Sequence, residues 1–157
     1  MKIILASVGK PHEAYVKAGI EDFTNRIEKY FSVNWLIIPP LKNAASLSEK
    51  DLKKQEATAI LQQIQKDDCL LLLDERGKLL SSPELAQLLQ QKANESTKRL
   101  LILIGGAFGV DETVNKRANY TISLSKLVFP HMLVRLIIAE QVYRACTILR
   151  NEKYHHI

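Results

Sequence analysis

Three short segments of the sequence carry residue types that suit ligand binding. They are Leu73–Gly77 (LDERG), Gly105–Gly109 (GGAFG) and Leu124–Phe129 (LSKLVF). Each directly follows a stretch that we expect to form a β-strand, and open α/β sheets bind ligands beyond the carboxyl ends of their strands. Glycine lets the backbone approach a ligand closely because it has no Cβ. The three segments therefore predict one shared cleft, although ordinary turn glycines would also explain the second segment.

The acidic residues of the first segment have a simpler explanation than catalysis. Asp74 and Glu75 could act as paired carboxylates, but adjacent side chains usually point apart, so an ion pair with Arg76 in a charged turn is the better interpretation. Gly105–Gly109 matches neither the dinucleotide-binding pattern nor a P-loop. The sequence has no serine–histidine–aspartate spacing and no clustered metal ligands, so we expect no metal.

Polar residues interrupt the predicted last helix, which runs from Pro130 to about Leu149. Glu140 and Arg144 are four residues apart and can pair on one helical face. Burying polar groups without partners is costly, so we expect the polar residues of this helix to pair or to line a site; they are Arg135, Glu140, Gln141 and Arg144.

The tail that follows combines positive charge with rings. Lys153, Tyr154, His155 and His156 lie together, and the whole chain carries a net charge of +5. Tyrosine and histidine stack on nucleobases, and arginine binds phosphate through two hydrogen bonds. This composition favours RNA as a partner but does not require it.

Strands alternate with helices in the elements that hold these residues. Apolar runs predict strands at 2–8, 33–38, 69–73, 99–104 and 120–124, and helices are expected at 11–29, from the 46–51 capping region to about 66, from Ser82, and at 130–149. Either Ser46 with Glu49 or Ser48 with Asp51 could cap the second helix, and Ser82 is the expected cap of the third. This pattern predicts one α/β domain over 1–157, with a mostly parallel sheet covered by helices on both faces.

The predicted last helix is apolar around nearly its whole circumference, and such a helix is buried on all sides. A chain of 157 residues has little structure of its own to cover both sides, so we expect a symmetric homodimer through this helix. A central helix in the core of a monomer is the alternative.

The cysteines and the apolar stretches indicate the redox state and the location of the protein. Cys69 and Cys146 lie in apolar stretches with no redox or zinc spacing, which predicts two reduced core thiols. We find no secretion signal and no stretch that could span a bilayer, so we expect a cytoplasmic protein that does not enter a membrane.

Four motifs together resemble the RlmH family, the SPOUT-class methyltransferases that act on a pseudouridine of 23S ribosomal RNA. The motifs are LDERGKLLSS (73–82), LIGGAFG (103–109), ISLSKLVFPHMLVRLIIAEQVYRA (122–145) and KYHH (153–156). The match covers essentially the whole chain. One departure is Lys153, where the family commonly has proline, and the chain closes with His156-Ile157 rather than with a charged residue.

The resemblance implies a C-terminal trefoil knot and S-adenosylmethionine as the methyl donor. It places the donor contacts at Leu73, Gly105, Leu124, Ser125, Lys126, Leu127, Val128 and Phe129. It also implies methylation of the N-3 atom of the pseudouridine, with assembled ribosomes as the substrate. A methyltransferase of the same superfamily that acts on tRNA, and a non-catalytic nucleotide- or RNA-binding module, are the alternatives.

The reaction suggests roles for several side chains. His155 and His131 are candidate bases for the N-3 proton, although His131 could instead cap or position the last helix. Arg135 and Arg144 could stabilise negative charge on the base carbonyls. RNA contacts are expected from Arg144, Lys153, Tyr154 and His155, with Tyr154 stacking on the target base and the tail contributed by the partner subunit.

Overall fold

The computed structural model describes residues 1–156, and all the strands of this part of the chain lie parallel in one sheet. The strands are β1 (Lys2–Val8), β2 (Ser32–Ile38), β3 (Cys69–Leu79), β4 (Arg99–Ile104) and β5 (Tyr120–Ser123). Their spatial order is β2-β1-β4-β3-β5. The predicted parallel α/β sheet is confirmed.

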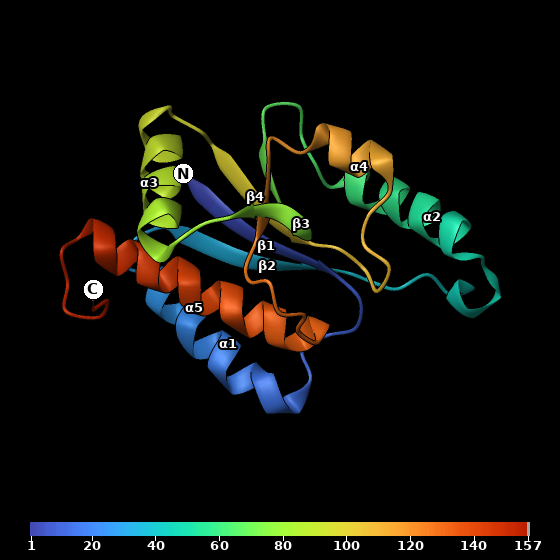
Figure 1. Ribbon diagram of the computed structural model, residues 1–157, viewed down its shortest axis with the longest axis horizontal. Coiled ribbons are helices and arrows are strands. Elements are labelled where there is room, and N and C mark those ends of the chain that lie inside the picture. The colour runs from blue at the N-terminus through green and yellow to red at the C-terminus, as the bar shows by residue number, and fades with distance from the viewer. Residues whose placement is uncertain (157) are drawn as a thin grey trace.

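Helices cover both faces of this sheet (Figure 1). Helices α1 (Ala14–Ile27), α3 (Ser82–Asn94) and α5 (His131–Leu149) pack on one face, with α5 against both α1 and α3. Helices α2 (Glu49–Gln62) and α4 (Glu112–Arg117) pack on the other, and a short 3-10 helix, Ala44–Ser46, precedes α2. The two-sided covering is therefore confirmed, whereas the trefoil knot stays a prediction of the family resemblance.

The uniformly apolar strands follow from this two-sided burial. In β4, Leu100 and Ile102 enter the core beneath α1, α3 and α5, while Leu101 and Leu103 enter the core beneath α2. Alternate residues of a strand point to opposite faces, so a central strand needs apolar residues at every position. Both cysteines are buried free thiols, as predicted.

The structure corrects the expected turn after residue 73. Strand β3 continues to Leu79, and its pairing with β5 shifts in register between Leu73 and Lys78. Gly77 lies at this irregularity, where an added Cβ would stand 2.5 Å from the carbonyl carbon of Ile122. The charged residues are tolerated in a strand because the extension is largely exposed.

Helix ends differ from the expected ones by a few residues. Helix α1 begins at Ala14 rather than at Pro11. Ser48, not Ser46, caps α2 by accepting a hydrogen bond from the Asp51 amide. Ser81 rather than Ser82 caps α3, where Ser81 and Glu84 form a capping box. The sequence analysis missed α4 altogether.

No helix within residues 1–156 combines the length and the hydropathy that a membrane span needs.

Candidate functional site

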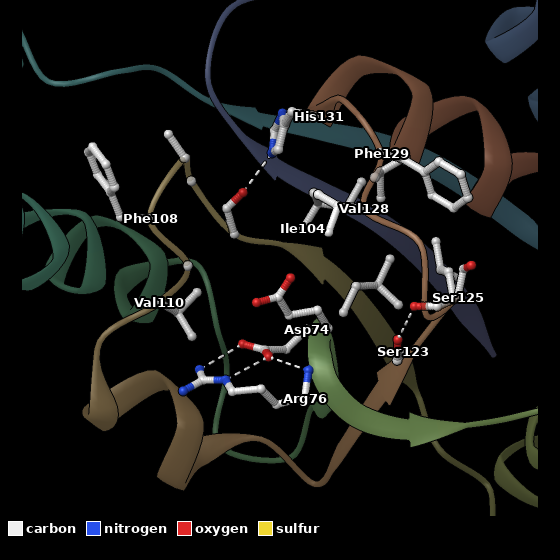
Figure 2. Close-up of a pocket in the computed structure, with 18 of the residues that line it drawn as sticks. Asp74, Arg76, Ile104, Phe108, Val110, Ser123, Ser125, Val128, Phe129 and His131 are labelled. Carbon is white, nitrogen blue, oxygen red and sulfur yellow. Dashed lines mark hydrogen bonds and ion pairs between the residues drawn. The ribbon is translucent and has the colours of Figure 1, made fainter.

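A cleft of about 570 Å³ opens where β4 and β5 end, beside the irregular part of β3 (Figure 2). The predicted donor-contact residues that line it are Leu73, Gly105, Leu124, Ser125, Leu127, Val128 and Phe129. The remaining predicted one, Lys126, does not line it. His131 and Val134 of α5 complete one wall. The fold thus brings together three segments that lie far apart in the sequence.

The glycine-rich segment after β4 leaves no room for a side chain at Gly105. A Cβ added there would stand 2.8 Å from Cγ1 of Val110. Further along, the Gly109 amide donates a hydrogen bond to the Gly106 carbonyl at 3.0 Å, and Gly109 has a φ of +82°. This tight turn holds Phe108 half-exposed at the edge of the cleft (Figure 2).

Two serines shape the segment after β5. The Ser123 hydroxyl donates to the Ser125 carbonyl at 2.9 Å, and the Leu127 amide donates to Oγ of Ser125 at 2.9 Å. The resulting turn leaves Leu127 and Val128 exposed to 72% and 80% of their surface. Large apolar side chains that are this exposed indicate a binding surface.

The carboxylate of Asp74 is held by Arg76. The Arg76 guanidinium donates Nε and Nη2 hydrogen bonds to the two carboxylate oxygens, each at 3.0 Å (Figure 2). These bonds are the main reason that the pKa of Asp74 lies below its usual range. The expected ion pair forms, although in a strand extension rather than in a turn. Asp74 is therefore an ionised, hydrogen-bonded wall residue and a poor proton acceptor at neutral pH.

His131 connects the first turn of α5 to the floor of the cleft. Its Nε2 lies 2.6 Å from the Gly105 carbonyl oxygen. Because a carbonyl can only accept, Nε2 carries the hydrogen and Nδ1 is the ring's acceptor. Burial lowers the pKa of His131, and the positive charge of Arg135 lowers it further. The ring is thus favoured in its neutral form, and the residue positions α5 as well as lining the cleft.

Arg135 does not reach the cleft. Its side chain is fully buried, and it donates hydrogen bonds to Oγ of Ser7 at 3.0 Å and to the Lys10 carbonyl at 2.8 Å. A further contact of 3.2 Å joins Nη1 to Nδ1 of His12, and Nη2 has no hydrogen-bond partner within the described residues. These contacts tie Arg135 to the end of β1 and to the loop that follows it, and its expected role toward substrate charge stays a prediction.

A second group of predicted residues lies at the other end of α5. Arg144 donates to Oε1 of Glu140 through Nε at 3.0 Å and through Nη2 at 2.5 Å. Its guanidinium carbon lies 4.7 Å from the centre of the Tyr154 ring. The Tyr154 hydroxyl donates to the same Glu140 oxygen at 3.0 Å. The predicted pairing of Glu140 with Arg144 is confirmed, and the tail folds back onto it.

His155 joins this group through Arg144. Nη1 of Arg144 lies 3.3 Å from Nδ1 of His155, and arginine can only donate, so Nδ1 accepts. The neutral ring then carries its hydrogen on Nε2. In this arrangement His155 offers the hydrogen on Nε2 as a donor, while its Nδ1 is occupied by Arg144.

The two groups are far apart within one chain. Thirteen residues of helix separate His131 from Arg144, which corresponds to about 20 Å at 1.5 Å per residue. Sequence reasoning found members of both groups. Gln141 was expected to pair or to line a site, and its Oε1 accepts a hydrogen bond from the Ser82 hydroxyl at 2.7 Å, a partner that the sequence did not indicate. Tyr30, which donates to Glu152 at 2.6 Å, was not predicted. Contacts across 59 and 122 residues leave no local signal.

Metal ligands do not gather at either group. Among residues 1–156, no three His, Cys, Asp or Glu side chains lie close enough to hold an ion.

A parallel α/β sheet with a glycine-rich cleft at its strand ends, lined by both apolar and charged side chains, is the usual arrangement of a small-molecule site in this fold class. Residues 1–155 match the family described as predicted SPOUT methyltransferase, and the chain belongs to that family of methyltransferases.

The curated relatives extend over the same length. The chain is 46% identical over 156 residues to the ribosomal RNA large subunit methyltransferase H of Cytophaga hutchinsonii, which covers 99% of this chain and 100% of the relative. The proteins of the same name from Parabacteroides distasonis and Christiangramia forsetii are each 43% identical over 156 residues, with 99% of both chains covered. The resemblance noted in the sequence is thereby confirmed.

Proposed function

We propose that this methyltransferase uses S-adenosylmethionine to methylate the N-3 atom of a pseudouridine in 23S ribosomal RNA. Its substrate would be the assembled ribosome, so it would work in the cytoplasm. The observation that carries the proposal is the convergence of the three strand-end segments on one cleft. The chain is also 46% identical over its length to a ribosomal RNA large subunit methyltransferase H.

The cleft suits the proposed donor in size and in chemistry. Its volume of about 570 Å³ lies within the range of about 300–1,000 Å³ that is usual for small-molecule sites. The space beside Gly105 is filled by Val110, whereas at Gly109 an added Cβ would meet no atom within 4 Å, so a ligand can approach the backbone there. Leu73, Leu124 and Phe129 supply apolar walls. Bound there, S-adenosylmethionine would supply a methyl group activated by its positive sulfur.

The cleft and the tail would complete each other in a homodimer. Along α5, Met132, Leu133, Leu136 and Ile137 form an apolar stripe that is only half-buried in the single chain, and Leu136 at its edge lies against Gly19 of α1. Farther along the same side lie Glu140, Gln141 and Arg144. The exposed Leu127 and Val128 adjoin the beginning of the stripe. A second copy packed on this stripe would remove these apolar side chains from water.

The geometry of α5 fixes what such a dimer would bring together. If two copies of α5 pack antiparallel about an axis near Ile137, a residue six or seven positions before it faces one six or seven positions after it. Arg144 of one copy would then lie near Pro130 and His131 of the other, at the mouth of that copy's cleft. Two-fold symmetry would thus close the separation of about 20 Å found within one chain.

Within this shared site, we assign roles from the hydrogen bonds that each group makes. N-3 must lose a proton as it is methylated, and the chain offers two candidate acceptors, Nδ1 of His131 and the ring of His155. Arg144 would stabilise negative charge on the base carbonyls. Tyr154 and Lys153 would contact the RNA by stacking and by charge. Arg135 would act as a positioning residue for the loop after β1.

Mapping of methylated nucleosides tests the substrate. Ribosomal RNA from cells with and without the gene is digested and compared by mass spectrometry, and purified protein with labelled donor is offered 70S ribosomes or bulk tRNA. We expect one methylated pseudouridine to vanish from 23S rRNA without the gene and label to enter ribosomes only. Label in tRNA instead would overturn the proposed substrate and favour the tRNA alternative.

Calorimetry with S-adenosylmethionine tests the donor separately. We expect binding by the wild type and weaker binding by Gly105→Val, because the added branched side chain cannot fit against Val110. A wild-type protein that binds RNA but no donor would be a binding module rather than a methyltransferase of this kind.

A third measurement tests the base. His155→Ala and His131→Gln are compared in single-turnover methylation over a range of pH. The residue that acts as base should lose about 10²–10⁴-fold in rate when replaced. A single-turnover rate unchanged in His155→Ala would remove His155 from that role.

A further inference from the structure

One hydrogen bond joins the end of the chain to the region just after α1. The Tyr30 hydroxyl donates to Oε2 of Glu152 at 2.6 Å, across 122 positions of sequence. Glu152 lies in the tail that follows α5, and Tyr30 lies three residues after the end of α1. We call this contact the Tyr30–Glu152 link.

The link acts at the point where the tail reverses direction. Asn151, just after α5, has a φ of +55°, and the Glu152 amide donates back to the Thr147 carbonyl at 2.9 Å. The Tyr154 amide then donates to the Glu152 carbonyl at 2.9 Å. Glu152 therefore anchors the turn through its backbone and is itself anchored through its side chain. Where the family commonly has proline, whose ring restricts the backbone, this chain has Lys153. The conformation of the turn must therefore be held by hydrogen bonds such as these.

A series of neighbouring aromatic rings leads from Tyr30 to the predicted RNA-binding residues of the tail. The Tyr30 and Tyr143 rings lie 6.4 Å apart, and Tyr143 contacts the Tyr154 ring edge-on at 4.7 Å. Tyr154 in turn packs on Arg144, which contacts His155. A displacement of Glu152 would consequently move Tyr154 relative to Arg144.

We propose that Tyr30 and Glu152 are positioning residues, which hold the tail so that Tyr154 and His155 meet the RNA together with Arg144. This inference rests on the proposed function for its RNA partner. The hydroxyl of Tyr30 remains a hydrogen-bond donor at neutral pH, because its bond to Glu152 raises its pKa to about 12.

The test removes each half of the link in turn. Tyr30→Phe keeps the ring beside Tyr143 and deletes only the donor, whereas Glu152→Ala deletes the acceptor and Glu152→Gln keeps an acceptor oxygen. Amide hydrogen exchange over residues 151–156 reports the tail directly, and a titration with 70S ribosomes reports RNA affinity. We expect faster exchange and about three- to tenfold weaker ribosome binding in Tyr30→Phe and Glu152→Ala, as a lost charge-assisted hydrogen bond implies.

Coupling distinguishes the link from two independent surface effects. The double variant Tyr30→Phe/Glu152→Ala should be no worse than either single variant, and Glu152→Gln should recover most of the affinity. Tyr15→Phe is the matched control, because Tyr15 lies on α1 with 63% of its surface exposed. Thermal unfolding is measured for each variant to check that it folds. If Tyr30→Phe does not fold, Glu152→Ala is the deciding variant, because Glu152 is exposed and its replacement should not disturb the core.

The outcomes separate this inference from the proposed function. Tail exchange and ribosome binding that match the wild type in Tyr30→Phe and Glu152→Ala would overturn the link, even if the wild type methylates ribosomes. Additive losses in the double variant would overturn it as well. A wild type that methylates no ribosomal RNA would refute the proposed function, while the exchange measurement would still decide whether the link holds the tail.

Discussion

At the scale of single residues, a side chain added at either of two glycines would meet a different kind of neighbour. A Cβ at Gly77 would stand 2.5–2.7 Å from backbone atoms of Ile122, whereas one at Gly105 would meet the end of the Val110 side chain at 2.8 Å. Backbone in a paired strand cannot move aside, but a side chain can rotate. We expect Gly77→Ala to lower the free energy of unfolding by about 1–3 kcal/mol, and Gly105→Ala to lower it less.

Urea denaturation of both variants checks this difference. If Gly77→Ala unfolds at the same urea concentration as the wild type, the close approach of β3 to β5 at this position is incorrect.

Two histidines should make stability depend on pH. Burial lowers the pKa of His12 and of His131 in the folded chain, and the charge of Arg135 lowers both further. As pH falls below about 6.5, the unfolded chain therefore binds more protons than the folded one, and the free energy of unfolding decreases. Above about pH 6.5 both states hold neutral rings and the contribution is constant.

The measurement compares urea midpoints at pH 7.5 and 5.5. The wild type should lose more stability between these values than His12→Gln does. Asp74, whose pKa is lowered mainly by Arg76, loses its contribution only below about pH 4 and lies outside this window. Equal losses in the wild type and the variant would contradict the assignment to His12.

Sequence reasoning could identify reactive residue types but not their surroundings. Arg135 looked like a candidate for substrate contact because it is a cation in an apolar helix. Its burial beneath the loop after β1 depends on Ser7 and Lys10, which are about 125 positions away in sequence. The Glu140–Arg144 pair, in contrast, follows from helical spacing alone and formed as expected.

At the scale of elements, two adjacent serines at the start of α3 have different roles. Ser81 accepts a hydrogen bond from the Glu84 amide and caps the helix, while the Ser82 hydroxyl donates to Gln141 of α5. Ser81→Ala should cost about 1 kcal/mol of stability through the lost cap. Ser82→Ala leaves the cap intact and should cost less.

Chemical denaturation of the two variants measures this difference. A larger loss in Ser82→Ala than in Ser81→Ala would place the cap at Ser82, where the sequence analysis expected it.

The elements that could not be predicted share a physical cause. The extension of β3 beyond Leu73 is held by pairing with β5, a partner over forty positions later, and its charged residues resemble a turn. Helix α4 spans only Glu112–Arg117, which is too short for a helical period to show. Strands β1, β2 and β4 and helix α5 carry strong patterns of their own and were predicted nearly to the residue.

At the scale of the whole molecule, the proposed dimer gives the sharpest prediction. Ile137→Asp places a charge in the apolar stripe of α5 and should yield a monomer with little methyltransferase activity. Analytical ultracentrifugation at micromolar concentration checks the first part. A wild-type protein that sediments as a monomer would contradict the proposed dimer.

Mixed subunits test whether the site is shared. Gly105→Val and Arg144→Ala should each be inactive alone, but a mixed dimer would hold one site with both residues intact. Random mixing would then restore about a quarter of wild-type activity. A mixture that stays inactive would show that Gly105 and Arg144 act within one chain.

The path of the whole chain is what sequence predicts least. Periodicity and apolar runs gave a parallel sheet with helices on both faces, but they say nothing about threading. The trefoil knot was expected only from the resemblance, because general rules of chain connection disfavour it.

The central place of α5 has a consequence for biosynthesis. The five strands and α1 to α4 all precede α5 along the chain, yet α5 lies between α1 and α3 on the sheet. While the nascent polypeptide is still being translated, the groove that α5 later fills stays open to water, and His131 has not yet reached Gly105. The protein therefore gains its catalytic shape late, only after α5 has emerged from the ribosome that makes it.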